Sequence, residues 1–417
     1  MHWDWARPRV RALVTCAAAA GAALAVTAGC TSPPAHPAAT LSPPTGSQPA
    51  TTISPSPAPT PTSATPTVSC AAQVFGRLTE AQRVGQLFLV GVFGDIAGPQ
   101  ITAALQQYHF GSLLLVPTSE GVTALAAATA HMQSLATTYD GGVRMFIAAN
   151  QEGGQVQHLT GPGFSTMPSA LTQGTWSTAT LRSAAAGWGR ELHAAGVNFD
   201  LAPVMDVVPA GTAASNGPVG ALDREFGSTP AGNGAHGAAF IAGMTSAGVA
   251  TAAKHFPGLG RVTGNTDFTA DVVDSVTTPD DPYLGSFRAA VAAGVPFVMV
   301  ALATYTQIDK TQLAVFSPAI MKLLRSGSGS GLGFGGVIMS DDLGDAQAVQ
   351  SIPVGTRAIS FLTAGGDMIT SQSLQPALAM AAAVLAKASS SASFRAVVDA
   401  AAQRVLAAKQ AAGLLSC

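Results

Sequence analysis

The chain has 417 residues, of which only 10% are charged, and its formal net charge is −2 at pH 7. This length fits one large barrel domain or about two or three average domains. A near-neutral charge without a basic cluster argues against nucleic-acid binding. Since no group of His, Cys, Asp or Glu has the spacing of metal ligands, we expect neither a metal nor another cofactor.

Residues 1–29 have the order of a secretory signal peptide. Three arginines precede an apolar, Ala-rich stretch over residues 12–26, which ends in small residues before Cys30. A Cys directly after Ala-Gly resembles a bacterial lipoprotein processing site, although Leu is more usual than Thr27 at its position. An ordinary cleaved signal or an uncleaved anchor helix is the alternative. We therefore expect an extracytoplasmic protein, associated with the cell wall or secreted, that Cys30 alone anchors to the membrane through a lipid.

Residues 30–69 form the next segment, which is rich in Pro, Ser, Thr and Ala. It contains no Asp, Glu, Lys or Arg. Such a composition cannot bury enough apolar surface to offset the entropy lost on ordering. We expect an extended tether here and a single folded domain over residues 70–417.

The cysteines divide between these parts of the chain. Cys16 falls in the signal peptide, so Cys70 and Cys417 remain at the two ends of the expected domain. Because an extracytoplasmic compartment is oxidising, we predict a disulfide between Cys70 and Cys417. Two free thiols are the alternative.

Short apolar runs alternate with Ala-rich helical stretches throughout the folded part. The runs lack strict alternation, as expected for parallel strands that are covered on both faces. The expected strands are 86–93, 111–117, 144–150, 197–207, 249–257, 295–302, 335–342 and 366–370. Helix-like stretches include 122–139, 180–195, 232–248, 283–294 and 317–325. Eight such repeats predict an α/β fold with a single (β/α)8 TIM barrel. A doubly wound open sheet is less favoured, because Gly258 and Gly260 are not followed by the third Gly and helix of a dinucleotide site.

Polar residues follow the ends of several expected strands. Barrel enzymes build their active sites at these carboxyl ends. The residues are Asn150, Gln151, Glu152, Asp206, Lys254, His255, Asp341 and Asp342. Since these residues were not used to define the strands, their clustering predicts an enzyme.

Four motifs carry a resemblance to a known family. They read NQEGG at 150–154, DREFG at 223–227, KHFPG at 254–258 and SDDL at 340–343. In this order they resemble family 3 glycoside hydrolases of the β-N-acetylglucosaminidase type, over about residues 75–412. The resemblance implies a barrel enzyme that removes non-reducing β-linked N-acetylglucosamine from cell-wall muropeptides, without a cofactor.

The resemblance also assigns the two catalytic groups of a retaining glycosidase. Asp341, the first Asp of SDDL, corresponds to the nucleophile, with a helix N-cap as the alternative; for Asp342 we prefer the capping role. The family's acid is a His on a flexible loop, oriented by an Asp two residues earlier. Asp267 and Asn265 stand at those positions here. Asp267 can serve as the acid if burial raises its pKa, with a solvated loop carboxylate or a simple turn as the alternatives.

The remaining matches concern binding of the sugar. Asn150 and His158 replace the family's Asp and Arg, Arg224 matches its sugar-contacting arginine, and Lys254 and His255 fit hydroxyl binding. We expect Asp206 or Glu152 to hold Lys254 charged. Glu152 serving only as a charge partner and His255 as a satisfied core residue are the alternatives.

The sequence therefore predicts a monomeric, carbohydrate-hydrolysing lipoprotein. Because the acid dyad is replaced, a lipoprotein that binds amino sugars without cleaving them is one alternative. A β-glucosidase of the same family is another, since Asn150 and His158 depart from the usual residues.

Overall fold

A computed structural model of the chain describes residues 68–93 and 96–417. The expected signal peptide, Cys30 and the expected tether up to residue 67 lie outside the described residues. No helix in the described part of the chain is long and apolar enough to cross a membrane.

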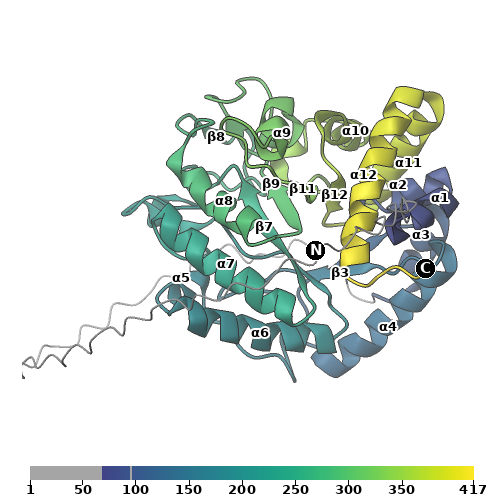
Figure 1. The fold of residues 1–417 in the computed structure, drawn as a ribbon, viewed down its shortest axis with the longest axis horizontal. Helices are drawn as coiled ribbons and strands as arrows, with labels where there is room; N and C mark the ends of the chain where they lie inside the picture. The colour runs from purple at the N-terminus through teal and green to yellow at the C-terminus, as the bar shows by residue number, and fades with distance from the viewer. Residues whose placement is uncertain (1–67, 94–95) are drawn as a thin grey trace, which may run out of the picture. The chain divides into compact units, whose positions relative to one another are not determined.

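The core of the domain is a closed barrel of parallel strands, seen roughly along its axis in Figure 1. Around the barrel the order is β1-β12-β11-β9-β7-β6-β3-β2. The strands are β1 (Phe88–Val92), β2 (Ser112–Leu115), β3 (Phe146–Ala149), β6 (Phe199–Asp200), β7 (Ala250–Phe256), β9 (Phe297–Val300), β11 (Val337–Asp342) and β12 (Met368–Ser371). Each lies within or overlaps one of the eight predicted runs, so the barrel is confirmed and the open sheet is excluded.

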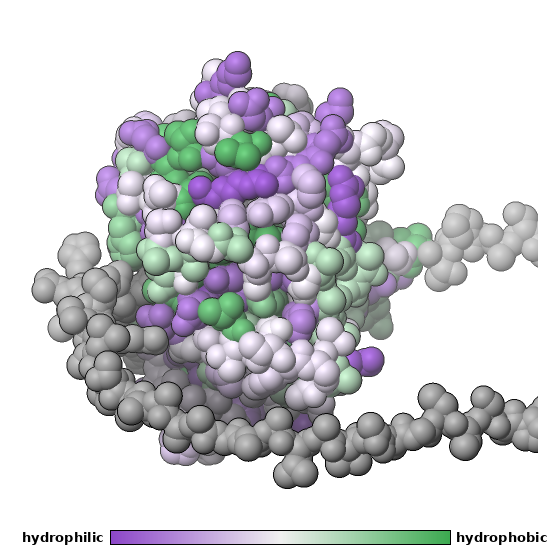
Figure 2. All heavy atoms as spheres, turned by 90° about the vertical axis from the view of Figure 1, so that its left-hand side faces the viewer, coloured by the Kyte–Doolittle hydropathy of each residue, from purple (hydrophilic) through white to green (hydrophobic). Residues whose placement is uncertain are grey.

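Helices form a ring outside the strands (Figure 1). They are α1 (Cys70–Arg77), α2 (Glu80–Gly85), α3 (Pro99–Tyr108), α4 (Val122–Tyr139), α5 (Ala170–Gln173), α6 (Thr178–Ala194), α7 (Pro230–Ser246), α8 (Gly285–Ala292), α9 (Pro318–Arg325), α10 (Val354–Ala364), α11 (Leu374–Ser390) and α12 (Ala392–Ala411). Two small sheets lie outside the barrel, β4 (Gln151–Gly153) with β5 (Val156–Gln157) and β8 (Val273–Asp274) with β10 (Thr304–Tyr305). Figure 2 shows the side that carries α7 and α8, where hydrophobic residues form small groups among hydrophilic ones.

Three phenylalanines fill the barrel interior. The rings of Phe146, Phe199 and Phe297 lie 5.5, 5.2 and 4.3 Å apart, measured between centroids in pairs. Since side chains alternate between the two faces of a strand, residues at even spacing from these rings also face inward. Asn150 lies four residues after Phe146, and Lys254 lies two after Ala252, the register partner of Phe297. The inward-facing side chains are therefore apolar in the middle of the barrel and polar at the carboxyl ends of the strands.

One predicted strand is much shorter than expected. The run 197–207 contributes only Phe199 and Asp200 to the barrel ladder. Pro203 lacks the N–H that a central strand needs, so the ladder is interrupted there and resumes only as an isolated bridge between Val204 and Lys254. The chain then continues as a loop, and the N–H of Met205 donates to the Lys254 carbonyl over 2.6 Å. This prediction was wrong in extent, and Asp206 is reached through a loop rather than at a strand end.

The opposite end of the barrel joins the two termini of the domain. Cys70 and Cys417 form the predicted disulfide, with Cα atoms 5.8 Å apart, so the alternative of free thiols is wrong. Nearby, the fully buried ammonium of Lys409 donates to Gln86 Oε1 over 2.6 Å and to the Gly111 carbonyl over 2.8 Å. These contacts fix α12 against the amino ends of β1 and β2.

Candidate active site

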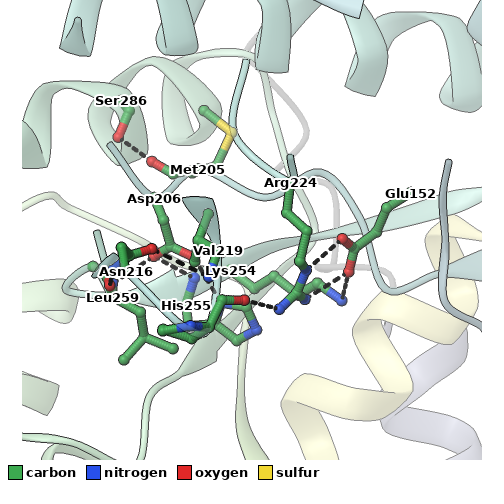
Figure 3. A network of polar contacts seen from close by, with 12 residues as sticks. Glu152, Met205, Asp206, Asn216, Val219, Arg224, Lys254, His255, Leu259 and Ser286 are labelled. Carbon is green, nitrogen blue, oxygen red and sulfur yellow. Dashed lines mark hydrogen bonds and ion pairs between the residues drawn. The ribbon is translucent and has the colours of Figure 1, made fainter. Parts of the chain in front are cut away.

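A buried carboxylate links two cations at the mouth of the barrel (Figure 3). Glu152 accepts hydrogen bonds from Arg224 Nε and Nη2, both over 2.8 Å, and its Oε1 lies 2.6 Å from Lys254 Nζ. Burial acts to raise the pKa of Glu152, but the charges of Arg224 and Lys254 outweigh it and hold that pKa well below its usual range. The sequence left open whether Glu152 or Asp206 pairs with Lys254, and the structure shows Glu152.

Asp206 pairs instead with His255. His255 Nδ1 lies 2.7 Å from Asp206 Oδ2, and the other carboxylate oxygen accepts from the backbone N–H groups of His255 and Leu259 over 3.1 and 2.7 Å. A carboxylate on Nδ1 fixes the orientation of the imidazole ring and leaves Nε2 for another partner. His255 is thus a buried residue that is also aligned for contact with a ligand.

Asn150 and His158 lie side by side on the hairpin formed by β4 and β5. The backbone N–H of His158 donates to the Asn150 carbonyl over 3.0 Å, and Lys254 Nζ donates to Asn150 Oδ1 over 2.8 Å. Burial, reinforced by the nearby charge of Lys254, lowers the pKa of His158 to about 4. At neutral pH the imidazole is therefore uncharged, and Lys254 and Arg224 are the cations of this side of the site.

Asp341 and Asp342 end β11 and have different partners. The register of β11 against β12 shifts between Met339 and Asp342, so strand alternation does not decide where Asp341 points. Its charge acts on the buried Asp267 carboxyl, which places Asp341 on the side of the barrel mouth. The Asp342 carboxylate accepts from the N–H groups of Gly344, Asp345 and Gln372 over 2.8 to 2.9 Å. The next helical turn, η5 (Gln347–Val349), begins beyond both residues, so Asp341 caps no helix in the described chain. The predicted helix N-cap role of Asp342 is wrong for the same reason, since its carboxylate bonds the N–H groups of a turn and not those of a helix.

Asp267 lies on the loop after β7, in a tight turn. Asn265 Oδ1 accepts from the Asp267 N–H over 3.0 Å, so Asn265 shapes the backbone of this turn. Burial raises the pKa of Asp267 to about 6, and the charge of Asp341 adds to the increase, while Arg224 and His255 oppose it. The carboxyls of Asp267 and Asp341 therefore interact across the mouth of the barrel.

Contacts that the sequence did not reveal hold this loop in place. The N–H groups of Gln347 and Ala348 donate to the carbonyls of Asp267 and Thr266 over 3.0 and 3.1 Å. Asn216 Nδ2 donates to two further carbonyls of the loop, and the Tyr305 hydroxyl donates to that of Gly258 over 2.8 Å. The acceptors of these hydrogen bonds are backbone carbonyls. Every residue has such a carbonyl, so the sequence does not show which one will be bonded. In the structure the loop that carries Asp267 is thus docked against the segment that follows β11.

The arrangement suits acid–base and nucleophilic chemistry on a polyhydroxylated molecule. One end of the site holds two carboxyls, Asp341 and Asp267, and the other holds hydrogen-bond donors. Among the described residues no cluster of His, Cys, Asp and Glu could hold a metal ion.

Comparisons with known proteins agree with this geometry. The sequence matches the glycosyl hydrolase family 3 N-terminal domain over residues 79–408. It is 32% identical to beta-hexosaminidase LpqI of Mycobacterium tuberculosis over 309 residues, which are 72% of this chain and 75% of that protein. The crystal structure of a beta-N-acetylhexosaminidase from Beutenbergia cavernae has a TM-score of 0.77 and 47% identity, covering 80% of this chain and 99% of that chain. A family 3 beta-N-acetylglucosaminidase from a Paenibacillus species has a TM-score of 0.71 and 28% identity, covering 81% of this chain and 63% of that chain.

Proposed function

The chain belongs to glycoside hydrolase family 3 and is a glycoside hydrolase, and we propose that it removes non-reducing β-linked N-acetylglucosamine by a retaining mechanism. The observation that carries this proposal is the carboxyl pair at the mouth of the barrel. Burial, together with the nearby charge of Asp341, raises the pKa of Asp267 to about 6. A carboxyl whose pKa is raised towards neutrality, beside a second carboxylate, is what a retaining glycosidase requires.

In the first step, the Asp341 carboxylate attacks the anomeric carbon and forms a glycosyl ester. Asp267 donates its proton to the departing oxygen, so the leaving group departs as an alcohol. In the second step, the ionised Asp267 removes a proton from water, which attacks the same carbon and releases Asp341. The two displacements give net retention of configuration.

The other site residues hold the sugar. Lys254, Arg224 and His255 have fixed orientations, because Glu152 and Asp206 engage part of their hydrogen-bonding capacity. Asn150 and His158 complete this side. Donors whose orientation is fixed before binding lose little entropy when they contact hydroxyls.

We also propose that the protein is a secreted lipoprotein that acts on cell-wall muropeptides. The signal-like residues 1–29, Cys30 and the Pro-rich segment support an extracytoplasmic location. Metabolic labelling with an alkynyl fatty acid tests the anchor. Label should appear on the wild-type protein and be lost in Cys30→Ala. Equal labelling of both proteins would contradict a lipid anchor at Cys30.

A second candidate function is sugar binding without cleavage. It is favoured by Asn265, which bonds the backbone of the turn and does not orient the Asp267 carboxyl.

One comparison separates these functions. The full chain is incubated with chromogenic β-N-acetylglucosaminide and β-glucoside, wild type beside Asp341→Ala. Release from the first substrate alone, lost in Asp341→Ala, is the expected result. Preference for the glucoside would indicate a β-glucosidase. Calorimetric binding of N-acetylglucosamine without release from either substrate would indicate the binding protein.

A further inference from the structure

The side chain of Asn150 presents only donors to the sugar site. Its carbonyl oxygen accepts from Lys254 Nζ over 2.8 Å. Because an ammonium group can only donate, the oxygen must face Lys254, and the amide nitrogen faces the other way. Among the described residues, no side chain or backbone group accepts from Asn150 Nδ2. Both of its N–H groups are therefore left for a ligand.

The neighbours of Asn150 supply few free acceptors. Asp200 Oδ1 accepts from the Gln151 N–H, and Oδ2 has no partner among the described residues; burial raises the pKa of this carboxyl well above its usual range, which favours its neutral form. Lys254 and Arg224 can only donate. The Glu152 carboxylate is 4% exposed and already accepts from Arg224 twice and from Lys254 once. His158 is neutral and has a single acceptor nitrogen at most.

The balance of charge points the same way. Glu152 offsets one of the two positive charges of Lys254 and Arg224. Burial raises the pKa of the neighbouring Asp200 well above its usual range, which favours its uncharged form, so this end of the site keeps a net positive charge. The remaining carboxylates that face the site are committed elsewhere. Asp206 is paired with His255, while Asp341 and Asp267 serve the anomeric carbon and the leaving group.

A sugar hydroxyl facing Asn150 would accept from Nδ2 but would have no good acceptor for its own proton. A buried donor without a partner costs free energy, whereas a group that only accepts has no such cost. We propose that Asn150 selects a sugar whose substituent at this position accepts hydrogen bonds without donating any, such as a carboxylate or a sulfate ester. This inference rests on the proposed function and narrows its substrate class.

Replacing the amide nitrogen of Asn150 by an oxygen turns a hydrogen-bond donor to the sugar into an acceptor. In Asn150→Asp, one carboxylate oxygen accepts from Lys254 and the other becomes an acceptor for the sugar. This variant should favour a hydroxyl and repel an anionic group. Gln155→Glu is a matched control, because it adds the same charge on the exposed part of the same hairpin.

The test compares kcat/KM of the full chain on aryl β-N-acetylglucosaminides. One substrate has all its hydroxyls; the others carry fluorine at ring position 3, 4 or 6, a carboxylate at position 6, or a sulfate ester at position 3, 4 or 6. We expect wild type and Gln155→Glu to prefer at least one carboxylate or sulfate substrate by about tenfold, and Asn150→Asp to prefer the parent by a similar factor. Comparing the carboxylate with the sulfates identifies which anion is taken, and the fluorinated sugars show which ring position tolerates loss of the donor.

Preference of wild type for the parent over every substituted sugar, unchanged in Asn150→Asp, would overturn the inference while leaving the hydrolase intact. Calorimetric binding of the corresponding free sugars gives the same ranking independently of turnover. If no substrate is hydrolysed but this ranking holds, the proposed function fails and the selectivity of Asn150 stands.

Discussion

The backbone carbonyl of Asp267 accepts a hydrogen bond of 3.0 Å from the N–H of Gln347, six residues beyond Asp341. The loop that carries the proposed acid is thereby fastened to the loop that follows the proposed nucleophile. A docked loop fixes the separation of the two carboxyls before any ligand binds, which is the kind of preorganisation that catalysis needs.

Removing this one N–H should impair turnover without disturbing the fold. Ala346, at φ −58° and ψ 131°, has the extended backbone that a residue before proline adopts. Gln347→Pro should therefore fold, lack the donor to Asp267, and lower kcat by about tenfold with little change in KM. Gln347→Ala keeps the N–H and should retain wild-type kcat. Equal rates in the two variants would show that the bond does not position Asp267.

The pH profile should report the protonation of Asp267. Its pKa is raised to about 6, mainly by burial and then by Asp341. The first step needs the protonated form, so kcat/KM should fall as pH rises through about 6. Asp267→Asn should be much slower and should lack this limb. The measurement is kcat/KM from pH 4 to 9 with a poor leaving group; an alkaline limb that survives in Asp267→Asn would assign it to another residue.

Glu152→Gln should weaken both binding and stability. Lys254 and Arg224 hold the pKa of Glu152 below its usual range, and the change leaves these two cations close together without a carboxylate between them. Breaking a buried ion pair on one side costs roughly 3 kcal/mol. We expect a lower free energy of unfolding in urea and a raised KM. Glu120→Gln, at an exposed position, is the control. Equal free energies of unfolding for Glu152→Gln and Glu120→Gln would contradict the prediction.

The lowered pKa of Glu152 also makes the free energy of unfolding of the protein depend on pH. A carboxylate whose pKa is lowered on folding stabilises the protein above its unfolded pKa, and this contribution is lost as pH falls towards the folded pKa. Wild type should therefore lose more stability than Glu152→Gln on acidification below about pH 4.5. Parallel loss in the two proteins would rule out this role.

The disulfide should matter for stability and not for chemistry. Cys70 and Cys417 lie beside the amino ends of the strands, since Arg144, just before β3, donates its N–H to the Leu414 carbonyl. Cys417→Ser should lower the free energy of unfolding by about 2–5 kcal/mol and leave kcat/KM near wild type at 25 °C. Ser416→Ala is the control. A large loss of activity in the folded Cys417→Ser protein would contradict this separation.

The sequence predicted the barrel because its strands are short apolar runs buried on both faces. The predicted end of the strand 197–207 was wrong, since Pro203 interrupts the ladder within a stretch whose composition stays apolar. The sequence also placed Lys254, His255 and Asp341 together at the mouth, because parallel strands bring their carboxyl ends to one edge.

The partners of these residues could not be predicted. Lys254 had two candidate carboxylates, and only the folded loops decide that Glu152 takes Lys254 and Arg224 while Asp206 takes His255. The orientation of Asn150 depends on a side chain 104 residues away. The docking of Asp267 depends on backbone donors, which every residue except proline carries.

The most direct test of the account uses Asp267→Ala with a β-N-acetylglucosaminide that carries a dinitrophenyl leaving group. Such a leaving group needs no acid, so the Asp341 ester should form and then accumulate, because no base activates water. Added azide should accelerate turnover and give the β-glycosyl azide, while the same addition to Asp341→Ala should give none. Absence of both a burst and an azide product from folded Asp267→Ala would contradict the roles of Asp341 and Asp267.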